Sequence, residues 1–214
     1  MQNSATRPRR RDIQGLRAVC MMQVLAFHAW TIGSPIGVDA FIMISAYLMT
    51  GSFVRRTEAG RMPFFAERWA NTFKRLLPPL VVTVLATLGA SALILPQTRW
   101  DELITQGFAS VTYWQNWRLA AVSANYFAAN RGVASPLQHL WSMSMQGQVF
   151  LAWPLLMTCC VLLARALHVR PRRIVAGAFA VLASASLWWL LASAPDDPTV
   201  YFDTRARLWE FALG

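Results

Sequence analysis

Five long apolar runs limit the folds open to this chain more than any other feature. They cover residues 13–30, 38–54, 76–95, 137–163 and 174–194. Each run is long enough for an α-helix to cross the hydrocarbon core of a bilayer. Apolar residues make up 56% of the 214 residues and charged residues only 14%, which favours several membrane spans over one soluble core. The sequence therefore predicts an all-α, polytopic transmembrane helix bundle with five spans.

The basic residues predict how these spans are oriented. Fourteen of the twenty Lys and Arg residues fall in three segments, at residues 7–11, 55–75 and 165–173. Since Lys and Arg concentrate on the cytoplasmic side of membrane proteins, we expect these segments in the cytoplasm. The segments expected outside are then residues 31–37, 96–136 and 195–205. The chain divides into a basic cytoplasmic N-terminus, residues 1–12, and a domain in the inner (plasma) membrane, residues 13–214. No small-residue cleavage site follows the first run, so we expect the first span to be retained.

Two further segments need a separate interpretation. Residues 102–121 are moderately apolar but contain several amide side chains and Arg118. A full span there would place the basic segment 165–173 outside, so we predict one interfacial or re-entrant helix, with Trp114 and Trp117 at headgroup depth. Residues 205–214 have the pattern of the start of a sixth span. We expect the domain to be C-terminally incomplete there.

Several common functions do not fit the sequence. The net charge of +10 comes from basic residues between apolar runs and not along one polar face, which argues against nucleic-acid binding. The three cysteines, Cys20, Cys159 and Cys160, fall in apolar segments without metal-ligand spacing or a disulfide framework. We find no phosphate-binding loop, dinucleotide fingerprint or hydrolase elbow. We accordingly expect no metal site.

Two ionisable residues lie inside the first apolar run, eleven positions apart. These are Arg17 and His28. Ionisable side chains at membrane depth are candidates for function. On a helix they are separated by about 16 Å along the axis, roughly half of the hydrocarbon thickness. Arg17 is suited to binding phosphate or a polarised carbonyl, or else it snorkels to the headgroups. His28 is suited to general-base catalysis near neutral pH, or else it makes an interhelical hydrogen bond.

The chain also resembles the acyltransferase-3 family of integral-membrane O-acyltransferases in several ordered blocks. These blocks are RDIQGLRA at residues 11–18 followed by Phe27-His28, GVDAFIMIS at 37–45, RLLP at 75–78, PLQHLWSMSM at 136–145 followed by WPLL at 153–156, and Tyr201-Phe202, Thr204-Arg205 and Trp209-Glu210-Phe211. Three positions depart from the family pattern. The family usually has Asp at Gln14, Arg at Thr72 and Glu in the pair Gln146-Gly147.

The resemblance implies roles for several residues. It supports His28 as the catalytic base, with Arg17, Lys74 and Arg75 binding the phosphates and thioester of an acyl-coenzyme A donor. Topology alone explains Lys74 and Arg75 almost equally well. Asp39 begins the second span after a short outer loop, where it either orients His28 or caps the helix.

Other polar side chains are candidate substrate contacts. They are Ser45, Ser142 and Gln146. Serines in membrane helices are more often packing residues. The family usually has a glutamate in the pair Gln146-Gly147, and its absence here weakens any role for Gln146. The tryptophans are more typical of interfacial anchors than of a sugar-stacking surface.

The predicted function is transfer of an acyl group, expected to be acetyl, across the membrane. Acyl-coenzyme A is the co-substrate, with no permanently bound cofactor. The acceptor is a hydroxyl of an envelope saccharide, a glycolipid or a small hydroxylated molecule. The alternative is a non-catalytic membrane protein, either a carrier whose pathway is lined by Arg17 and His28 or a truncated remnant that acts as an assembly partner.

Overall fold

A computed structural model describes residues 11–30, 36–60, 65–129, 135–194 and 197–214. Throughout these residues the regular structure is helical, as the apolar runs predicted. The α-helices are α1 (Arg11–Trp30), α2 (Ile36–Glu58), α3 (Phe65–Ile94), α4 (Trp100–Val111), α5 (Gln115–Ala129), α6 (Trp141–Ala166), α7 (Pro171–Ala192) and α8 (Thr204–Leu213). Short 3₁₀ turns precede three of them: η1 (Gln97–Arg99), η2 (Gln138–Leu140) and η3 (Val200–Phe202).

Four helices of the described chain are long and apolar enough to cross a membrane. They are α2, α3, α7 and the continuous segment of η2 with α6, Gln138–Ala166. Together with the family evidence given below, they make this a multi-pass membrane protein. Helix α1 has 20 residues but is not among the four, because Gln14, Arg17, Gln23 and His28 lower its mean hydropathy. Its membrane crossing stays a prediction.

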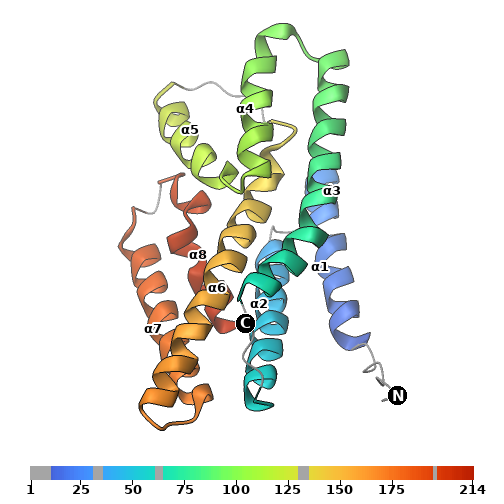
Figure 1. Ribbon diagram of the computed structural model, residues 1–214. Helices are drawn as coiled ribbons and strands as arrows, with labels where there is room; N and C mark the ends of the chain where they lie inside the picture. The colour runs from blue at the N-terminus through green and yellow to red at the C-terminus, as the bar shows by residue number, and fades with distance from the viewer. Residues whose placement is uncertain (1–10, 31–35, 61–64, 130–134, 195–196) are drawn as a thin grey trace, which may run out of the picture.

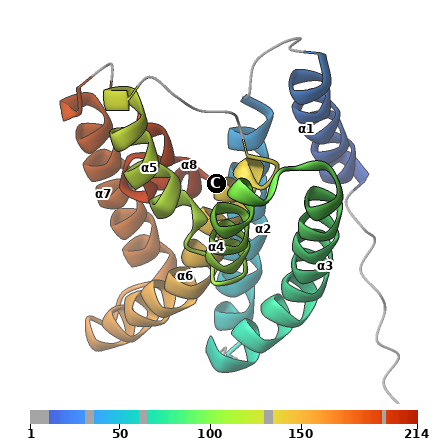
Figure 2. The same ribbon diagram turned by 90° about the horizontal axis from the view of Figure 1, so that it is seen from above.

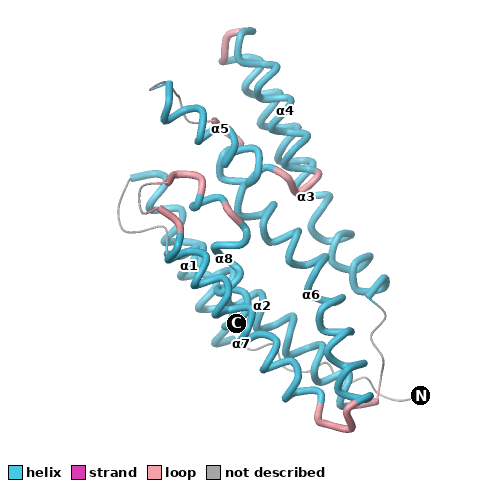
Figure 3. The backbone as a smooth tube through the Cα atoms, turned by 90° about the vertical axis from the view of Figure 1, so that its left-hand side faces the viewer, coloured by secondary structure: helices cyan, strands magenta, loops and turns pink. Residues whose placement is uncertain are grey.

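The segment predicted as one interfacial helix is divided into two. Helix α4 ends at Val111 and α5 begins at Gln115, and between them Tyr113 has a φ of 58° in the left-handed region. The prediction of a single helix was therefore wrong in number. Figures 1 and 3 show α4 and α5 at the end of the bundle opposite the turn that joins α6 to α7. Helix α4 packs back along α3, where a Cβ built on Gly107 would lie 3.1 Å from the Val84 side chain.

The bundle has a tightly packed side and a more open side. Seen from above, α5, α7 and α8 lie on one side, α1 and α3 on the other, and α2 and α6 between them (Figure 2). The larger core cluster joins α2, α6, α7 and α8 through side chains such as Phe53, Trp153, Phe179 and Phe211. Because lipid tails are as apolar as these side chains, close packing and not exclusion from water stabilises such a cluster in a bilayer.

Candidate active site

A basic cavity opens between α1, α2 and α3, at the end of the bundle where α2 ends and α3 begins. Its volume is about 1070 Å³, and Phe150 of α6 forms part of its wall. The ionisable side chains that line it are Arg17, Arg56, Glu67, Arg68 and Arg75. Four positive charges therefore face one negative charge across the described lining. A cavity with this balance attracts anions.

Two of these arginines lie against aromatic rings of α2. The Arg17 guanidinium carbon is 4.9 Å from the centre of the Phe41 ring, and that of Arg68 is 5.9 Å from the centre of the Phe53 ring. Arg68 also donates from Nη2 to the Met49 carbonyl oxygen at 3.3 Å and to the Ser52 hydroxyl. Both guanidinium groups are thus positioned by α2 before any ligand arrives.

The cavity brings together two of the three predicted donor-binding residues. Arg17 and Arg75 both line it, whereas Lys74 is exposed and does not. Sequence reasoning missed Arg68 as part of this site. The signal was present, because positions 68, 71, 72 and 75 recur at the spacing of one helix face and all four line the cavity. Lys74 does not lie on that face of the helix.

Asp39 belongs to a second, partly buried ionic cluster. Arg207 Nη1 donates to Asp39 Oδ1 and to Glu210 Oε1, at 2.8 Å in each case. Glu210 is only 2% exposed, and its other carboxylate oxygen has no hydrogen-bond partner among the described residues. The Arg207 guanidinium carbon also lies 5.3 Å from the Trp141 ring centre and 4.7 Å from that of Tyr201. One arginine therefore ties α8 to α2.

His28 is placed by its backbone only, because its side chain lies outside the described residues. A Cβ built on Gly37 would be 2.7 Å from the Cys20 carbonyl oxygen, so the start of α2 lies beside the middle of α1. His28 follows eight residues after Cys20, about 12 Å further along α1. Its pairing with Asp39 stays a prediction, while the described partner of Asp39 is Arg207.

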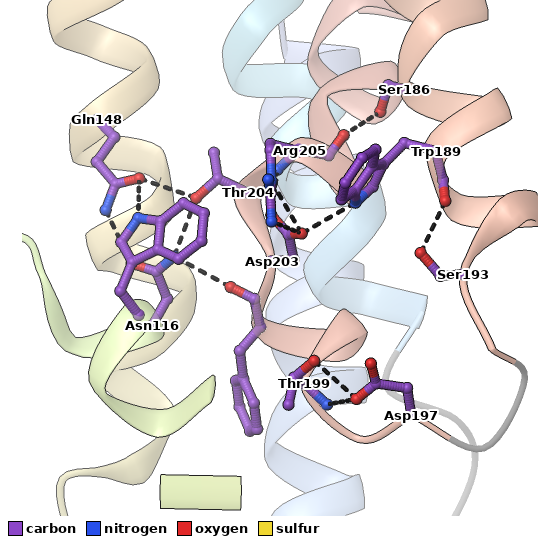
Figure 4. Close-up of polar contacts among 12 residues, drawn as sticks. Asn116, Gln148, Ser186, Trp189, Ser193, Asp197, Thr199, Asp203, Thr204 and Arg205 are labelled. Carbon is purple, nitrogen blue, oxygen red and sulfur yellow. Dashed lines mark hydrogen bonds and ion pairs between the residues drawn. The ribbon is translucent and has the colours of Figure 1, made fainter. Parts of the chain in front are cut away.

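A polar network connects α5, α6 and α8 at the end of the bundle away from the cavity (Figure 4). Asn116 is fully buried and donates to the Phe202 carbonyl at 3.0 Å and to Thr204 Oγ1 at 2.9 Å. Gln148 donates to Asn116 Oδ1 at 2.8 Å and accepts from Thr204 Oγ1 at 2.8 Å. Asp203 caps α8 by accepting from the Arg205 backbone N–H at 2.8 Å. The network fixes the start of α8, which carries Arg207.

Comparison with known proteins identifies the family. The model of the acyltransferase domain family matches residues 10–214, nearly the whole chain. This chain belongs to that acyltransferase family. It is 27% identical over 208 residues to the peptidoglycan O-acetyltransferase OatA of Listeria monocytogenes, with 95% of the chain and 32% of that protein covered. It is 31% identical over 211 residues to the O-acetyltransferase OatA of Staphylococcus aureus, with 94% and 33% covered. The chain thus spans about a third of the length of these relatives. No solved structure matches it.

The acyltransferase blocks of the sequence contribute to both the basic cavity and the ionic cluster. The first and third blocks supply Arg17 and Arg75 to the basic cavity, and the second and last supply Asp39 and Glu210 to the ionic cluster. The positions that depart from the family pattern also lie in two different parts of the structure. Gln14 and Thr72 line the cavity, whereas Gly147 packs against Tyr113.

The three candidate substrate contacts have local surroundings. Ser45 donates to the Phe41 carbonyl at 2.9 Å and Ser142 to the His139 carbonyl at 3.3 Å, both within or next to their own helix. Gln146 is half-buried on α6. Gln148, two residues later, is the amide that carries the polar network, and sequence reasoning did not single it out. Contact of these side chains with a substrate stays a prediction.

Proposed function

We propose that this chain forms the membrane domain, or its N-terminal part, of an O-acyltransferase that moves an acetyl group from acetyl-coenzyme A to a hydroxyl of an envelope saccharide. The observation that carries the proposal is the basic cavity, which offers an anionic donor four arginines beside a single acid. The acceptor class is supported by the names of the relatives, one of which is a peptidoglycan O-acetyltransferase.

The proposed topology puts the cavity on the cytoplasmic side. Arg55 and Arg56 lie in the last turn of α2, and Arg68 and Arg75 lie in the first turns of α3. The basic turn between α6 and α7 lies at the same end of the bundle as the end of α2 (Figure 1). By the positive-inside trend that end faces the cytoplasm, where acyl-coenzyme A is made. Helix α1 would then be a fifth span with a cytoplasmic N-terminus in the plasma membrane, and α8 the start of a sixth.

In the proposed reaction, the acceptor hydroxyl oxygen attacks the thioester carbonyl carbon and the carbon–sulfur bond breaks. His28 takes the hydroxyl proton as the new ester bond forms and returns it to the departing sulfur, so that no net proton is consumed. Arg17, about 16 Å from His28 along α1, guides the thioester of the donor into the bundle from the cytoplasmic side, and the acetyl group reaches His28 for the transfer itself. The donor enters from the side of Arg75, and the acceptor approaches from the other end of α1.

The test measures transfer of labelled acetyl from acetyl-coenzyme A to extracted envelope glycans by membranes that contain the chain. We expect His28→Asn to lower the rate by about 100-fold or more, since loss of a general base costs that much. His168→Asn is the matched control, because His168 is exposed in the turn after α6 and tolerates Asn at its φ of 54°. Equal rates in parent and His28→Asn would refute the catalytic assignment and favour the non-catalytic alternative.

A further inference from the structure

The basic cavity is not electrically balanced by its own walls. Among the described lining residues, Glu67 is the acid that faces Arg17, Arg56, Arg68 and Arg75. Arg56 and Arg68 also repel one another across the end of the cavity. Like charges held close together cost free energy unless a ligand brings compensating negative charge. The cavity is therefore suited to a ligand with more than one negative charge.

Arg68 differs from Arg17 in that hydrogen bonds to α2, and not only a ring contact, hold its guanidinium in place. Its Nη2 makes both hydrogen bonds to α2, to the Met49 carbonyl and to the Ser52 hydroxyl, and its guanidinium lies near the Phe53 ring. The hydrogen bonds described for Arg68 both use Nη2, so among the described residues the N–H groups of Nη1 and Nε are available to a ligand. A guanidinium already fixed in place loses less side-chain entropy on binding an anion than a free lysine does.

The positions along α2 also match the shape of a long donor. Arg17 lies over Phe41 and Arg68 near Phe53, which are twelve residues apart on α2. That separation is about 18 Å along the helix axis. In acyl-coenzyme A the pantetheine arm similarly separates the thioester at one end from the phosphates at the other. The spacing of Arg17 and Arg68 therefore suits the two ends of one molecule, with the thioester end toward Arg17 and the phosphates at Arg68.

We infer that Arg68 is the fixed anchor for the phosphates of the acyl-coenzyme A donor, that Arg56 and Arg75 complete this anion site, and that Lys74 takes no part in it. The inference rests on the proposed function, because it names residues for the donor of that reaction. Of the pair predicted from sequence, the inference keeps Arg75 and omits Lys74. It adds Arg68 on the same face of α3 and Arg56 near the end of α2. The ligand chemistry it requires is a clustered phosphate.

The test measures binding of coenzyme A to the purified chain in detergent. We expect Arg68→Gln to weaken binding by at least about tenfold, since hydrogen bonds to charged groups are worth that much. Lys74→Gln is the matched control, because it removes the same charge from the same helix outside the cavity, and we expect a change below about twofold. Equal effects of the two substitutions would overturn the inference. Pantetheine, which lacks the phosphates, should bind the parent and Arg68→Gln alike.

Two further variants keep the test decisive if Arg68→Gln does not fold. Arg68→Lys retains the positive charge but loses the planar guanidinium with its paired N–H donors. Ser52→Ala removes the hydroxyl that accepts one of the two hydrogen bonds from Arg68. Each should weaken coenzyme A binding by a few-fold while the thermal midpoint stays close to that of the parent. Unchanged affinity in both variants would contradict the anchoring role of Arg68.

A phosphate-bearing lipid headgroup has the same chemistry, and a second arm separates it from the nucleotide. The chain is placed in nanodiscs of phosphatidylcholine with or without phosphatidylglycerol, and coenzyme A binding is measured in each. We expect Arg68→Gln to lower coenzyme A affinity in both. If it lowers only phosphatidylglycerol retention, the cavity holds a headgroup and the inference fails. If the parent binds no coenzyme A, the proposed donor itself fails, whereas equal binding by parent and Arg68→Gln refutes only the anchor.

Discussion

The two sides of the bundle differ in how completely their helices are buried. The well-buried side holds the fold together, and the less buried side carries the candidate active site. In α1 the only side chain with full burial among the described residues is Cys20, and α1 borders the basic cavity. In α6 eleven residues are buried, and Met145, Met157 and Ala164 have no exposed surface. A transferase needs an open wall for its reactants and a rigid wall to hold that opening in shape.

The two sides also differ in how well their polar and charged groups are paired. On the packed side, Asn116, Gln148 and Thr204 satisfy one another, and Arg207 is shared by two carboxylates. On the open side, the cavity arginines outnumber the acid that faces them. Substitutions on the packed side should therefore lower stability first, and those in the cavity should lower donor affinity first.

The largest loss of stability is expected for Arg207→Gln. Its guanidinium compensates the charge of buried Glu210 and also binds Asp39. Removing one partner of a buried ion pair costs about 3–5 kcal/mol. Arg205→Gln is the control two residues earlier, because its side chain is 57% exposed and Asp203 keeps hydrogen bonds from the Arg205 backbone N–H and from Trp189, so we expect a smaller loss. The measurement is the unfolding midpoint in detergent.

A second variant sharpens this result. If the loss comes from the uncompensated carboxylate, Glu210→Gln added to Arg207→Gln should recover part of it. No recovery would mean that Arg207 does not stabilise the bundle by compensating Glu210. Its contacts with Asp39, Trp141 and Tyr201 would then carry the effect.

A smaller loss is expected where α6 meets the turn between α4 and α5. A Cβ built on Gly147 would lie 2.0 Å from Cδ1 of Tyr113, so Gly147→Ala must displace that ring. Overpacking of this kind costs about 1–3 kcal/mol. Gly177→Ala in α7 is the matched control, because nothing lies within 4 Å of its Cβ, and helix propensity should stabilise it by up to about 1 kcal/mol. Thermal melts that rank the two alike would disprove the close approach.

These sites show what a single sequence can and cannot predict. Four of the five apolar runs fall in helices long and apolar enough to cross a membrane, because the bilayer sets the length of a crossing helix. The start of α3 was missed by eleven residues, since its first turns carry the polar face that lines the cavity. The division at Tyr113 was also missed, because no glycine marks its left-handed backbone.

The ionic cluster could not be derived from sequence at all. Asp39 was singled out by its place before the second span, but its partner Arg207 is 168 residues away. Pairings at that distance depend on how α8 packs against α2, which no local pattern encodes. Arg68, by contrast, could have been found from helical spacing, because it shares one face of α3 with Arg75.

The third expected loss concerns the polar network and tests Gln146 at the same time. Asn116→Ala removes the donor to the Phe202 carbonyl and one acceptor of Gln148, which keeps its bonds to Tyr113 and Thr204. Leaving the buried Phe202 carbonyl without this bond costs about 1–3 kcal/mol. Gln146→Ala, two residues before Gln148, should cost below about 0.5 kcal/mol. If Gln146 contacts substrate, its variant lowers acetyl transfer while its melting midpoint stays at the parent value. Equal destabilisation by the two variants would contradict the distinction drawn between these amides.

The smallest effect is expected at the ion pair between α4 and α5, and it depends on pH. Arg118 donates to Glu102 at 2.6 Å, and Gln106 to the same carboxylate at 2.7 Å. Burial raises the pKa of Glu102, but these hydrogen bonds and the charges of Arg118 and Arg99 outweigh it and hold the pKa below 4.5. A lowered pKa in the folded state contributes stability that is present above the unfolded value and is lost as the pH falls through the folded value.

Because the Glu102 side chain is 44% exposed, solvent screening limits the contribution to under about 1 kcal/mol. We expect the difference in melting midpoint between parent and Glu102→Gln to shrink as the pH is lowered from 6 to about 3. Asp101→Asn removes the same charge from the same helical turn and should show a smaller pH-dependent difference, since Arg118 pairs with Glu102. A difference for Glu102→Gln that is constant over this range would show that the ion pair does not stabilise the connection between α4 and α5.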